Sequence, residues 1–297
     1  MNHLIKNSLK KGYNDIVRAG HAGLEYTELA ILNLGAGESY EEKLDGKELV
    51  GVILGGKCTV TVTCATAARS KSKIQLARRS LGEGGNPKSK ITWADIGARN
   101  NVFGGKATGF YLPVGTKMQI ESSTGANIAL CRAPSQLECE PILVTPQDVR
   151  VNTVGRHNWR REVHNIIHFG HKCRHLVVGE TYNPPGNWSS FPPHCHEKDN
   201  PPIEADMEEV YHFRISPSNG FGFQRIYKDD RSVDAVYTLH DGDTVVIPDG
   251  YHPVAAAPGH RLYYLWILAG KRRELFPRDD PNYAWVKNCE AVIDGMT

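Results

Sequence analysis

The stretch that decides the fold runs from residue 186 to residue 196 and reads Gly-Asn-Trp-Ser-Ser-Phe-Pro-Pro-His-Cys-His, ending in His194, Cys195 and His196. Side chains on a β-strand alternate between its two faces. The two histidines are therefore expected to point the same way and the cysteine the opposite way. An isolated His-x-His pair is more often incidental than functional in a chain with 13 histidines, so its surroundings decide the interpretation.

The sequence after the histidine pair contains the other ligands of a metal site. Glu209 opens a later predicted strand, and His252 ends a Gly-x5-Pro-x-Gly-x-His stretch that begins at Gly242. Three imidazoles and one carboxylate form a ligand shell that suits Mn, Fe, Co, Ni or Zn and leaves coordination positions open. Glu208 is the alternative carboxylate, but Glu209 has the strand parity that we expect to face inward. The predicted metal ligands are His194, His196, Glu209 and His252.

Length and composition exclude several classes of protein. The chain has 297 residues, of which 40% are hydrophobic and 23% charged. One large domain or two smaller ones are expected, and a disordered, collagenous or coiled-coil chain is excluded. The 35 basic and 33 acidic side chains leave a formal charge of +2 without a basic block, so nothing favours a nucleic-acid partner or an anionic membrane.

Three features predict a cytoplasmic protein. The longest strongly apolar stretch, residues 262–270, is too short to span a bilayer. The first residues lack the apolar core of a signal peptide. Seven scattered cysteines, an odd number, favour reduced thiols over a disulfide framework.

Almost every segment with a clear pattern is predicted to be a short β-strand, rich in Val, Ile, Tyr and Phe and bounded by Gly, Pro, Asn or Asp. The expected strands are Glu48–Leu54, Lys57–Thr63, Gly109–Leu112, Asn127–Cys131, His175–Val178, Glu209–Ile215, Gly222–Tyr227, Thr244–Ile247 and Leu262–Leu268. Their spacing favours an all-β sandwich or barrel. Helices are expected to be few, with a single turn at Pro146–Arg150 and a mostly irregular tail after Pro277.

A short internal sequence repeat divides the chain into two halves. The motif Pro-x-Gly-x-Lys at residues 113–117 matches Pro-x-Gly-x-His at residues 248–252, with a constant offset of 135 residues. Further upstream, Glu48 can be set against Glu209. We therefore expect two related halves joined near residues 133–165.

The residues around the predicted metal site resemble the cupin superfamily. Its first motif is Gly-x5-His-x-His-x(3 or 4)-Glu-x6-Gly, and its second is Gly-x5-Pro-x-Gly-x2-His-x3-Asn. This chain departs from them in three ways. Seven residues instead of five lie between Gly186 and the first histidine. Twelve residues instead of three or four separate His196 from Glu209, which implies a loop insertion at Lys198–Asp206. Only Tyr251 separates Gly250 from His252, and Ala256 stands at the place of the final Asn.

A narrower resemblance covers most of residues 150–285. The segments GETYNPPGNWSSFPPHCH, MEEVYHFRI, GFGFQRIY, DGDTVVIPDGYHPVAAAPGH and LYYLWILAG are together similar to the 5-deoxy-glucuronate isomerases of inositol catabolism. These enzymes are relatives of the 4-deoxy-threo-hexosulose-uronate isomerases of pectin breakdown.

This resemblance implies an all-β bicupin, which is a pair of jelly-roll barrels with few short helices. Residues 1–135 would form a degenerate barrel without metal ligands, residues 136–165 a linker, and residues 166–297 the metal-binding barrel. The first half agrees, since it has no histidine pair and has Lys117 at the position of His252. A homodimer is also expected, on the sole ground that bicupins often pair their sheets across an interface between subunits.

The resemblance also implies a reaction, an aldose–ketose isomerisation of a small sugar acid. 5-Deoxy-D-glucuronate would become 5-dehydro-2-deoxy-D-gluconate through a metal-stabilised enediolate. One divalent ion per chain is expected; Zn or Mn is favoured because no redox change occurs, and Fe or Ni stays open. The alternatives are an iron-dependent dioxygenase, which the same ligands allow, and a non-catalytic sugar-binding cupin.

The catalytic and substrate-binding side chains are less well defined by the sequence. Tyr211 and Gln224 are the catalytic candidates, Tyr211 as a base and Gln224 only as a group that holds a hydroxyl. The sequence does not separate Tyr211 from the alternative bases, which are a metal-bound hydroxide and the side chains of Tyr182, Lys198, Glu208 and Tyr264. The substrate-binding candidates are Tyr182, Lys198, Tyr264 and Arg225.

The substrate carboxylate requires a cation, for which Arg225, Arg214 and Arg161 are available. Strand alternation allows only one of Gln224 and Arg225 to point inward. By the same alternation, His212 is expected to face outward and not to be a ligand.

Overall fold

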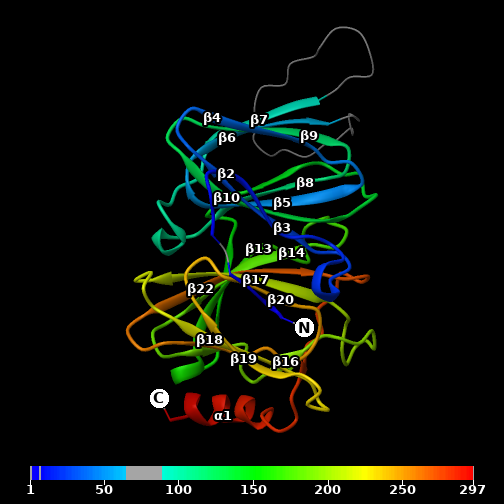
Figure 1. The fold of residues 1–297 in the computed structure, drawn as a ribbon. Coiled ribbons are helices and arrows are strands. Elements are labelled where there is room, and N and C mark those ends of the chain that lie inside the picture. The colour runs from blue at the N-terminus through cyan, green and yellow to red at the C-terminus, as the bar shows by residue number, and fades with distance from the viewer. Residues whose placement is uncertain (1, 7, 65–88, 297) are drawn as a thin grey trace.

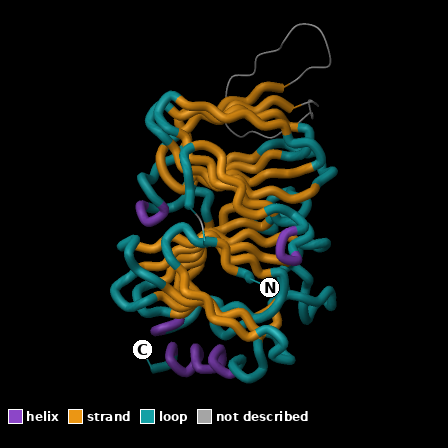
Figure 2. The backbone as a smooth tube through the Cα atoms, viewed as in Figure 1, coloured by secondary structure: helices purple, strands orange, loops and turns teal. Residues whose placement is uncertain are grey.

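The structure is a computed structural model that describes residues 2–6, 8–64 and 89–296. Two β-barrels are stacked on one another, and strands build nearly all of both (Figures 1 and 2). The first half of the chain forms most of the upper barrel in Figure 1, and the second half forms most of the lower one. The expected all-β bicupin is therefore confirmed.

The N-terminal barrel consists of a six-stranded and a four-stranded antiparallel sheet, with aliphatic side chains between them. The larger sheet has the order β11 (Ile142–Val144), β8 (Thr108–Leu112), β5 (Lys47–Gly56), β10 (Ala126–Pro134), β3 (Glu28–Leu34) and β2 (Gly12–Val17). The smaller has the order β4 (Glu38–Lys43), β9 (Thr116–Ser122), β6 (Cys58–Cys64) and β7 (Ser89–Ile96).

The C-terminal barrel has a seven-stranded sheet, a four-stranded sheet and a short strand pair. The largest sheet has the order β1 (Leu4–Ile5), β20 (Thr244–Ile247), β17 (Glu208–Ser216), β22 (Arg261–Ala269), β14 (Val177–Asn183), β13 (Arg161–Ile167) and β12 (Arg150–Val154). The second has the order β15 (Trp188–Ser189), β21 (Val254–Ala256), β18 (Gly222–Tyr227) and β19 (Asp234–Leu239), and the pair is β16 (His194–Cys195) with β23 (Arg278–Asp279).

The two larger sheets share one strand order, which confirms the internal repeat. β8, β5, β10, β3 and β2 correspond to β20, β17, β22, β14 and β13, and the repeated Pro-x-Gly turns follow β8 and β20. The edge position beside β8 is held by β11, and the matching position beside β20 is held by β1 from the chain's N-terminus.

The predicted ranges 1–135, 136–165 and 166–297 therefore need correction. The first strand completes the second barrel, and the expected linker supplies β11 to one barrel and most of β13 to the other.

Helices are few among the described residues. Three single 3-10 turns occur at His21–Gly23, Val102–Gly104 and His157–Trp159, and a chain turn occurs at residues 146–148. The expectation of a mostly irregular tail is wrong, because α1 spans Trp285–Asp294. Only one residue of α1, Val286, is buried, although the apolar residues Trp285, Val286, Cys289, Val292 and Ile293 recur at the spacing of one helix face. No helix in the described ranges is long and apolar enough to cross a membrane.

Two buried carboxylates link the barrels in opposite directions. Glu48 of β5 is fully buried and accepts hydrogen bonds from three successive backbone N–H groups of residues 174–176, at 2.7, 2.7 and 2.9 Å. Glu208 of β17 accepts three from residues 25–27 of the other barrel. Both loops immediately precede the corresponding strands β14 and β3. The structural counterpart of Glu48 is therefore Glu208, one residue before the Glu209 suggested by the sequence.

We expect Glu48→Ala to destabilise the fold by about 2–4 kcal/mol, because it leaves three N–H donors, two of them buried, and the Tyr111 hydroxyl without their acceptor. Thermal and denaturant unfolding would measure the loss. Glu41→Ala, which removes an exposed partner of Lys117, should cost less than about 0.5 kcal/mol. Equal losses in the two variants would contradict the linking role of Glu48.

Candidate metal centre

Four side chains from separate segments meet inside the C-terminal barrel. His194 lies on β16 and His196 directly follows it, Glu209 is the second residue of β17, and His252 lies between β20 and β21. Ligand atoms of the three histidines lie within 4.8 Å of one another. Glu209 Oε2 lies 3.4 Å from His196 Nε2 and 3.3 Å from His252 Nε2. Ligand atoms that each lie about 2.1 Å from one ion are roughly 3–4 Å apart, so these spacings suit one cation.

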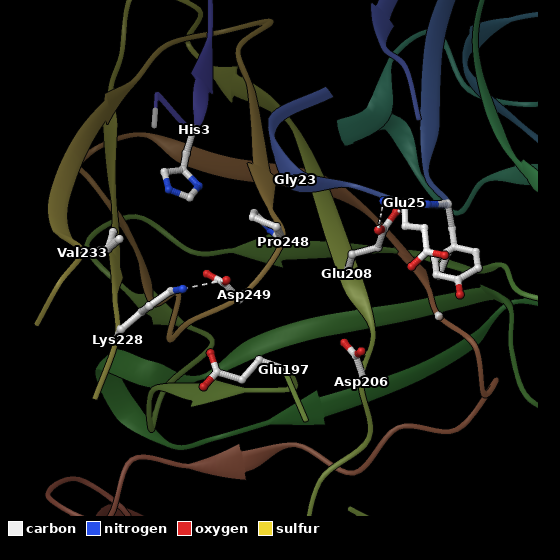
Figure 3. A pocket seen from close by; sticks show the side chains of 13 residues that line it. His3, Gly23, Glu25, Glu197, Asp206, Glu208, Lys228, Val233, Pro248 and Asp249 are labelled. Carbon is white, nitrogen blue, oxygen red and sulfur yellow. Dashed lines mark hydrogen bonds and ion pairs between the residues drawn. The ribbon is translucent and has the colours of Figure 1, made fainter. Parts of the chain in front are cut away.

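Strand alternation along β17 separates the two neighbouring carboxylates. Tyr211 and Phe213 pack inside the barrel, and Glu209 shares their face. Val210 packs between the barrels, and Glu208 shares that opposite face. Figure 3 shows Glu208 in a cavity of about 400 Å³, bonded to the backbone of Glu25.

Backbone carbonyl groups orient two of the imidazoles. His196 Nδ1 is bonded to the carbonyl of Met207, and His252 Nδ1 lies 2.9 Å from the carbonyl of Gly250. A carbonyl only accepts, so Nδ1 carries the proton in both rings and Nε2 is directed at Glu209. His252 Nε2 is buried and makes no hydrogen bond with any described residue. A buried nitrogen of this kind is what a metal ion would satisfy.

The electrostatics of the group also suit a cation. Burial would raise the pKa of Glu209, but the nearby imidazoles of His196 and His252 outweigh it and lower the pKa to about 2. Burial and the neighbouring imidazoles hold the pKa of His194 well below its usual value. Burial alone would also lower the pKa of His196, but the contact with Glu209 outweighs this effect and raises the pKa. A charged carboxylate and neutral imidazoles are the forms that bind metals.

A turn at Gly250 brings His252 to the other ligands. The φ angle of Gly250 is 88°, and a Cβ there would lie 2.9 Å from the carbonyl oxygen of Tyr227. Only glycine adopts this conformation without strain. The N–H of Gly250 donates to Glu197 Oε2 at 2.9 Å, and Glu197 directly follows His196. The turn is thereby bonded to the histidine-pair segment.

Arg278 connects the same segments from β23, which pairs with β16. Its guanidinium group contacts Glu204 at 2.7 Å, Asp229 at 3.0 Å and Glu197 at 3.8 Å, and donates to the hydroxyl of Tyr251. Glu204 also accepts a contact from Cys195 at 3.5 Å. Cys195, Glu197 and Glu204 could by themselves hold a metal ion, but the Arg278 side chain already supplies a positive charge there.

Two tyrosines line the barrel interior beside the ligands. The Tyr211 hydroxyl lies 3.2 Å from Ser190 Oγ, and the Tyr264 hydroxyl donates to Ser189 Oγ at 3.0 Å. The two rings are 4.3 Å apart, and the Tyr211 ring lies 5.9 Å from that of His252. Burial raises the pKa of Tyr264, and burial together with Glu209 raises that of Tyr211 well above its usual value. Both hydroxyls therefore keep their protons at neutral pH.

Gln224 lies on the inner face of β18 and Arg225 on its outer face. Gln224 is fully buried, and neither amide atom has a hydrogen-bond partner among the described residues. Arg225 instead forms a two-bond ion pair with Asp234, both bonds 2.7 Å, and stacks on Tyr227. The prediction that Arg225 contributes to the site is therefore wrong, for the reason of alternation noted from the sequence.

Two other predicted substrate-binding residues lie away from the ligands. Tyr182 is on the reverse face of β14, where its hydroxyl is bonded to Arg99 at 2.9 Å and Glu180 at 3.0 Å. The structure thus contradicts a substrate role at the metal centre. Lys198 is exposed in the loop that follows His196, and its predicted role stays a prediction.

His212 faces away from the ligands, as expected, but it is not exposed. It is buried at the junction of the barrels, and its Nδ1 lies 3.0 Å from the Thr244 hydroxyl. Burial, with a smaller effect of Arg214, lowers its pKa to about 3. The outer face of this sheet packs against the other barrel and not against solvent. The sequence does not reveal that packing.

Arg161 is the arginine that the fold brings to the site. Its Nη1 donates to the carbonyl groups of Trp159 and Phe191 at 3.2 and 3.1 Å, and its charge acts on His194. Burial lowers its pKa. Arg214 is paired with Asp241 at 2.9 Å. No sequence signal separated Arg161 from the other two arginines or pointed to Arg278.

Comparisons with known proteins agree with this geometry. Residues 4–286 match the KduI/IolB family. The chain belongs to this family. It is 35% identical over 294 residues to the 5-deoxy-glucuronate isomerase of Bacillus licheniformis, a match that covers 96% of this chain and 99% of the relative. Family membership makes the chain an isomerase.

Solved structures support the same assignment. The crystal structure of an IolB-like protein from Salmonella typhimurium superposes with a TM-score of 0.84 and 31% identity, covering 97% of this chain and 100% of that one. A Lactobacillus farciminis oxalate decarboxylase has a TM-score of 0.62 at 11% identity, covering 99% and 93% of the two chains. At that identity it shows only a shared fold.

We expect His252→Ala to remove bound metal and turnover while leaving the protein folded, because it deletes one of four ligands. Metal content per chain, measured after gel filtration, should fall from near one to near zero. His240→Ala, at an exposed histidine, is the control. Full activity of metal-free His252→Ala protein would refute the metal site.

We expect Arg278→Met to raise the dissociation constant for Co²⁺ about tenfold or more and to change the absorption spectrum of the bound ion, since Arg278 holds the ligand segments in place. Arg278→Lys should restore part of the affinity. Arg272→Met, which removes an exposed partner of Asp199, should change neither value. An unaltered spectrum in Arg278→Met would contradict the positioning role.

Proposed function

We propose that this isomerase converts 5-deoxy-D-glucuronate into 5-dehydro-2-deoxy-D-gluconate and that it requires one divalent metal ion, Mn or Zn being favoured. The observation that carries the proposal is the convergence of three imidazoles and Glu209 inside the C-terminal barrel, with unpaired polar groups on the surrounding walls. The similarity to the 5-deoxy-glucuronate isomerase of Bacillus licheniformis supports the choice of substrate.

The reaction moves one proton between neighbouring carbons. A proton leaves the hydroxyl-bearing carbon beside the aldehyde and is returned to the former carbonyl carbon, through an enediolate. The proton of the neighbouring hydroxyl moves to the former aldehyde oxygen, so the aldehyde becomes an alcohol and the alcohol a ketone. When bound, a divalent ion supplies a Lewis acid that makes this carbon more acidic and stabilises negative charge on the oxygens. His194, His196, Glu209 and His252 would hold that ion.

Tyr211 is placed to serve the reacting oxygens. Its buried hydroxyl keeps its proton, and its ring lies 5.9 Å from that of His252, so the hydroxyl can donate a hydrogen bond where charge develops. Ser190 anchors the hydroxyl, and its φ of 49° is unusual for a residue other than glycine. Such strained backbone is often kept at functional positions. Tyr264 packs against the Tyr211 ring and restricts its position.

Gln224 and Arg161 would bind the remainder of the substrate. The unpaired amide of Gln224 can donate to one hydroxyl and accept from another. The substrate carboxylate lies at the opposite end of the carbon chain from the aldehyde and requires a separate cation. Arg161 has one nitrogen committed to two carbonyl groups, which orients the group and leaves its other donors for a carboxylate.

The experiment that tests the function is an NMR time course with 5-deoxy-D-glucuronate under nitrogen, using metal-loaded and chelator-treated protein. We expect the aldehyde hydrate signal to be replaced by a ketone signal only in the metal-loaded sample. Nitrogen excludes an oxygen-dependent reaction, so conversion would also refute the dioxygenase alternative. Absence of conversion with Mn, Zn, Fe and Ni would refute the proposed substrate.

We expect Arg161→Met to raise KM for the sugar acid at least about tenfold and to change kcat less, because it removes a contact made in ground and transition states alike. Initial rates over a range of substrate concentrations measure both constants. Arg225→Met is the matched control and should behave like the wild type. A raised KM in Arg225→Met together with an unchanged KM in Arg161→Met would show that Arg225, and not Arg161, binds the substrate carboxylate.

A further inference from the structure

A second cavity lies at the junction of the two barrels, on the reverse side of the sheet that forms one wall of the metal site. Its volume is about 470 Å³, within the range of small-molecule sites. Its floor is formed by the β13, β14 and β22 ends, and its roof by residues 103–106 of the N-terminal barrel. None of the candidate metal ligands lines it.

Positive charge dominates its rim. Lys106, Arg160 and Arg261 are exposed cations of the lining, and Glu162 is its only acid. Lys106 donates to the carbonyl of Val149 at 3.1 Å, which leaves its charge uncompensated. The only ion pair among the described lining residues joins Glu162 to a histidine. An anion would therefore be attracted to this cavity.

That histidine, His164, is 93% buried, and neither ring nitrogen is hydrogen-bonded to any residue that the structure describes. The carboxylate of Glu162 is 3.5 Å from its Nε2 and does not satisfy it. Its ring lies 4.6 Å from that of Tyr182. Buried polar groups without partners are rare and point to an occupant that provides the bond.

The walls are largely apolar and flat. Phe103, Pro184, Pro185 and Leu262 line the cavity with the ring of Tyr182. The Arg261 guanidinium group lies 4.7 Å above the Phe103 ring. Guanidinium groups and aromatic rings both stack well on planar groups. A bare sugar acid has no flat apolar face to match these walls.

We propose that this cavity binds a small molecule in which a phosphate or carboxylate is attached to a planar ring. Arg261, Arg160 and Lys106 contact the anionic group, His164 forms a hydrogen bond to the ring, and Phe103 and the prolines pack on its face. A nucleotide and an aromatic acid share this chemistry.

The cavity is placed to influence the metal site. Residues alternate along β13, so the side chains of Glu162 and His164 face the cavity. Arg161, which precedes them, also borders the cavity, but its guanidinium group donates to the carbonyl of Phe191 beside the metal site. Along β22, Tyr264 faces the interior and Tyr263 the opposite side. An occupant that shifts β13 would therefore move Arg161, the proposed carboxylate-binding residue.

The test is isothermal titration calorimetry of chelator-treated protein with adenosine 5′-monophosphate and, separately, benzoate. Inorganic phosphate and adenosine are the control ligands. We expect one of the two test ligands to bind once per chain with a dissociation constant below about 1 mM. Arg261→Glu and His164→Phe should each weaken binding about tenfold or more. Lys57→Glu, an equivalent charge change on an exposed turn of the N-terminal barrel, should not.

Three results would overturn the proposal: no saturable binding of either ligand, binding unchanged by Arg261→Glu, or inorganic phosphate binding as tightly as the nucleotide. Comparing the dissociation constants of the nucleotide and benzoate shows whether the cavity prefers a phosphate or a carboxylate attached to the ring. Because the protein is metal-free in this experiment and no metal ligand lines the cavity, failure of the isomerase assay would leave the result standing.

Discussion

Alternation of side chains along β17 is the constraint on which the rest of this structure depends. Two neighbouring carboxylates leave the strand in opposite directions. Glu208 accepts three backbone N–H groups of the other barrel, and Glu209 faces two imidazoles inside its own. A shift of one residue in the register of β17 would exchange these roles and lose both the connection between the barrels and the metal site.

Buried charge in this protein is consistently compensated. Glu48 and Glu208 are satisfied by loop N–H groups, and Glu180 by the Arg99 guanidinium group, which contacts both of its oxygens. These contacts hold the barrels in one arrangement, since an unpaired buried carboxylate is costly. In contrast, His252 Nε2 and the amide of Gln224, inside the second barrel, form no hydrogen bond within the described part of the chain. That difference separates the groups that hold the fold together from those available to a ligand.

Much of the architecture could be predicted because local patterns carry it. Short apolar runs between glycine and proline turns predicted the all-β fold, and the repeated Pro-x-Gly turn predicted two related halves. The expectation of an irregular tail overlooked α1, whose apolar residues Trp285, Val286, Cys289, Val292 and Ile293 recur at helical spacing. The place of β1 in the second barrel could not be predicted, since a two-residue strand pairs with β20 from the far end of the chain. Arg278 was missed for the same reason, as nothing near it in sequence indicates its contacts with Glu204 and Tyr251.

The sequence by itself determined the four metal ligands that we propose, because strand parity and motif spacing are local properties. It also required that only one of Gln224 and Arg225 face inward. Only the tertiary structure decided which one, and only it chose Arg161 among three arginines and placed Tyr182 on the reverse face. The physical reason is that a strand pattern shows that two faces differ, whereas the neighbours of each face depend on how sheets distant in sequence pack together.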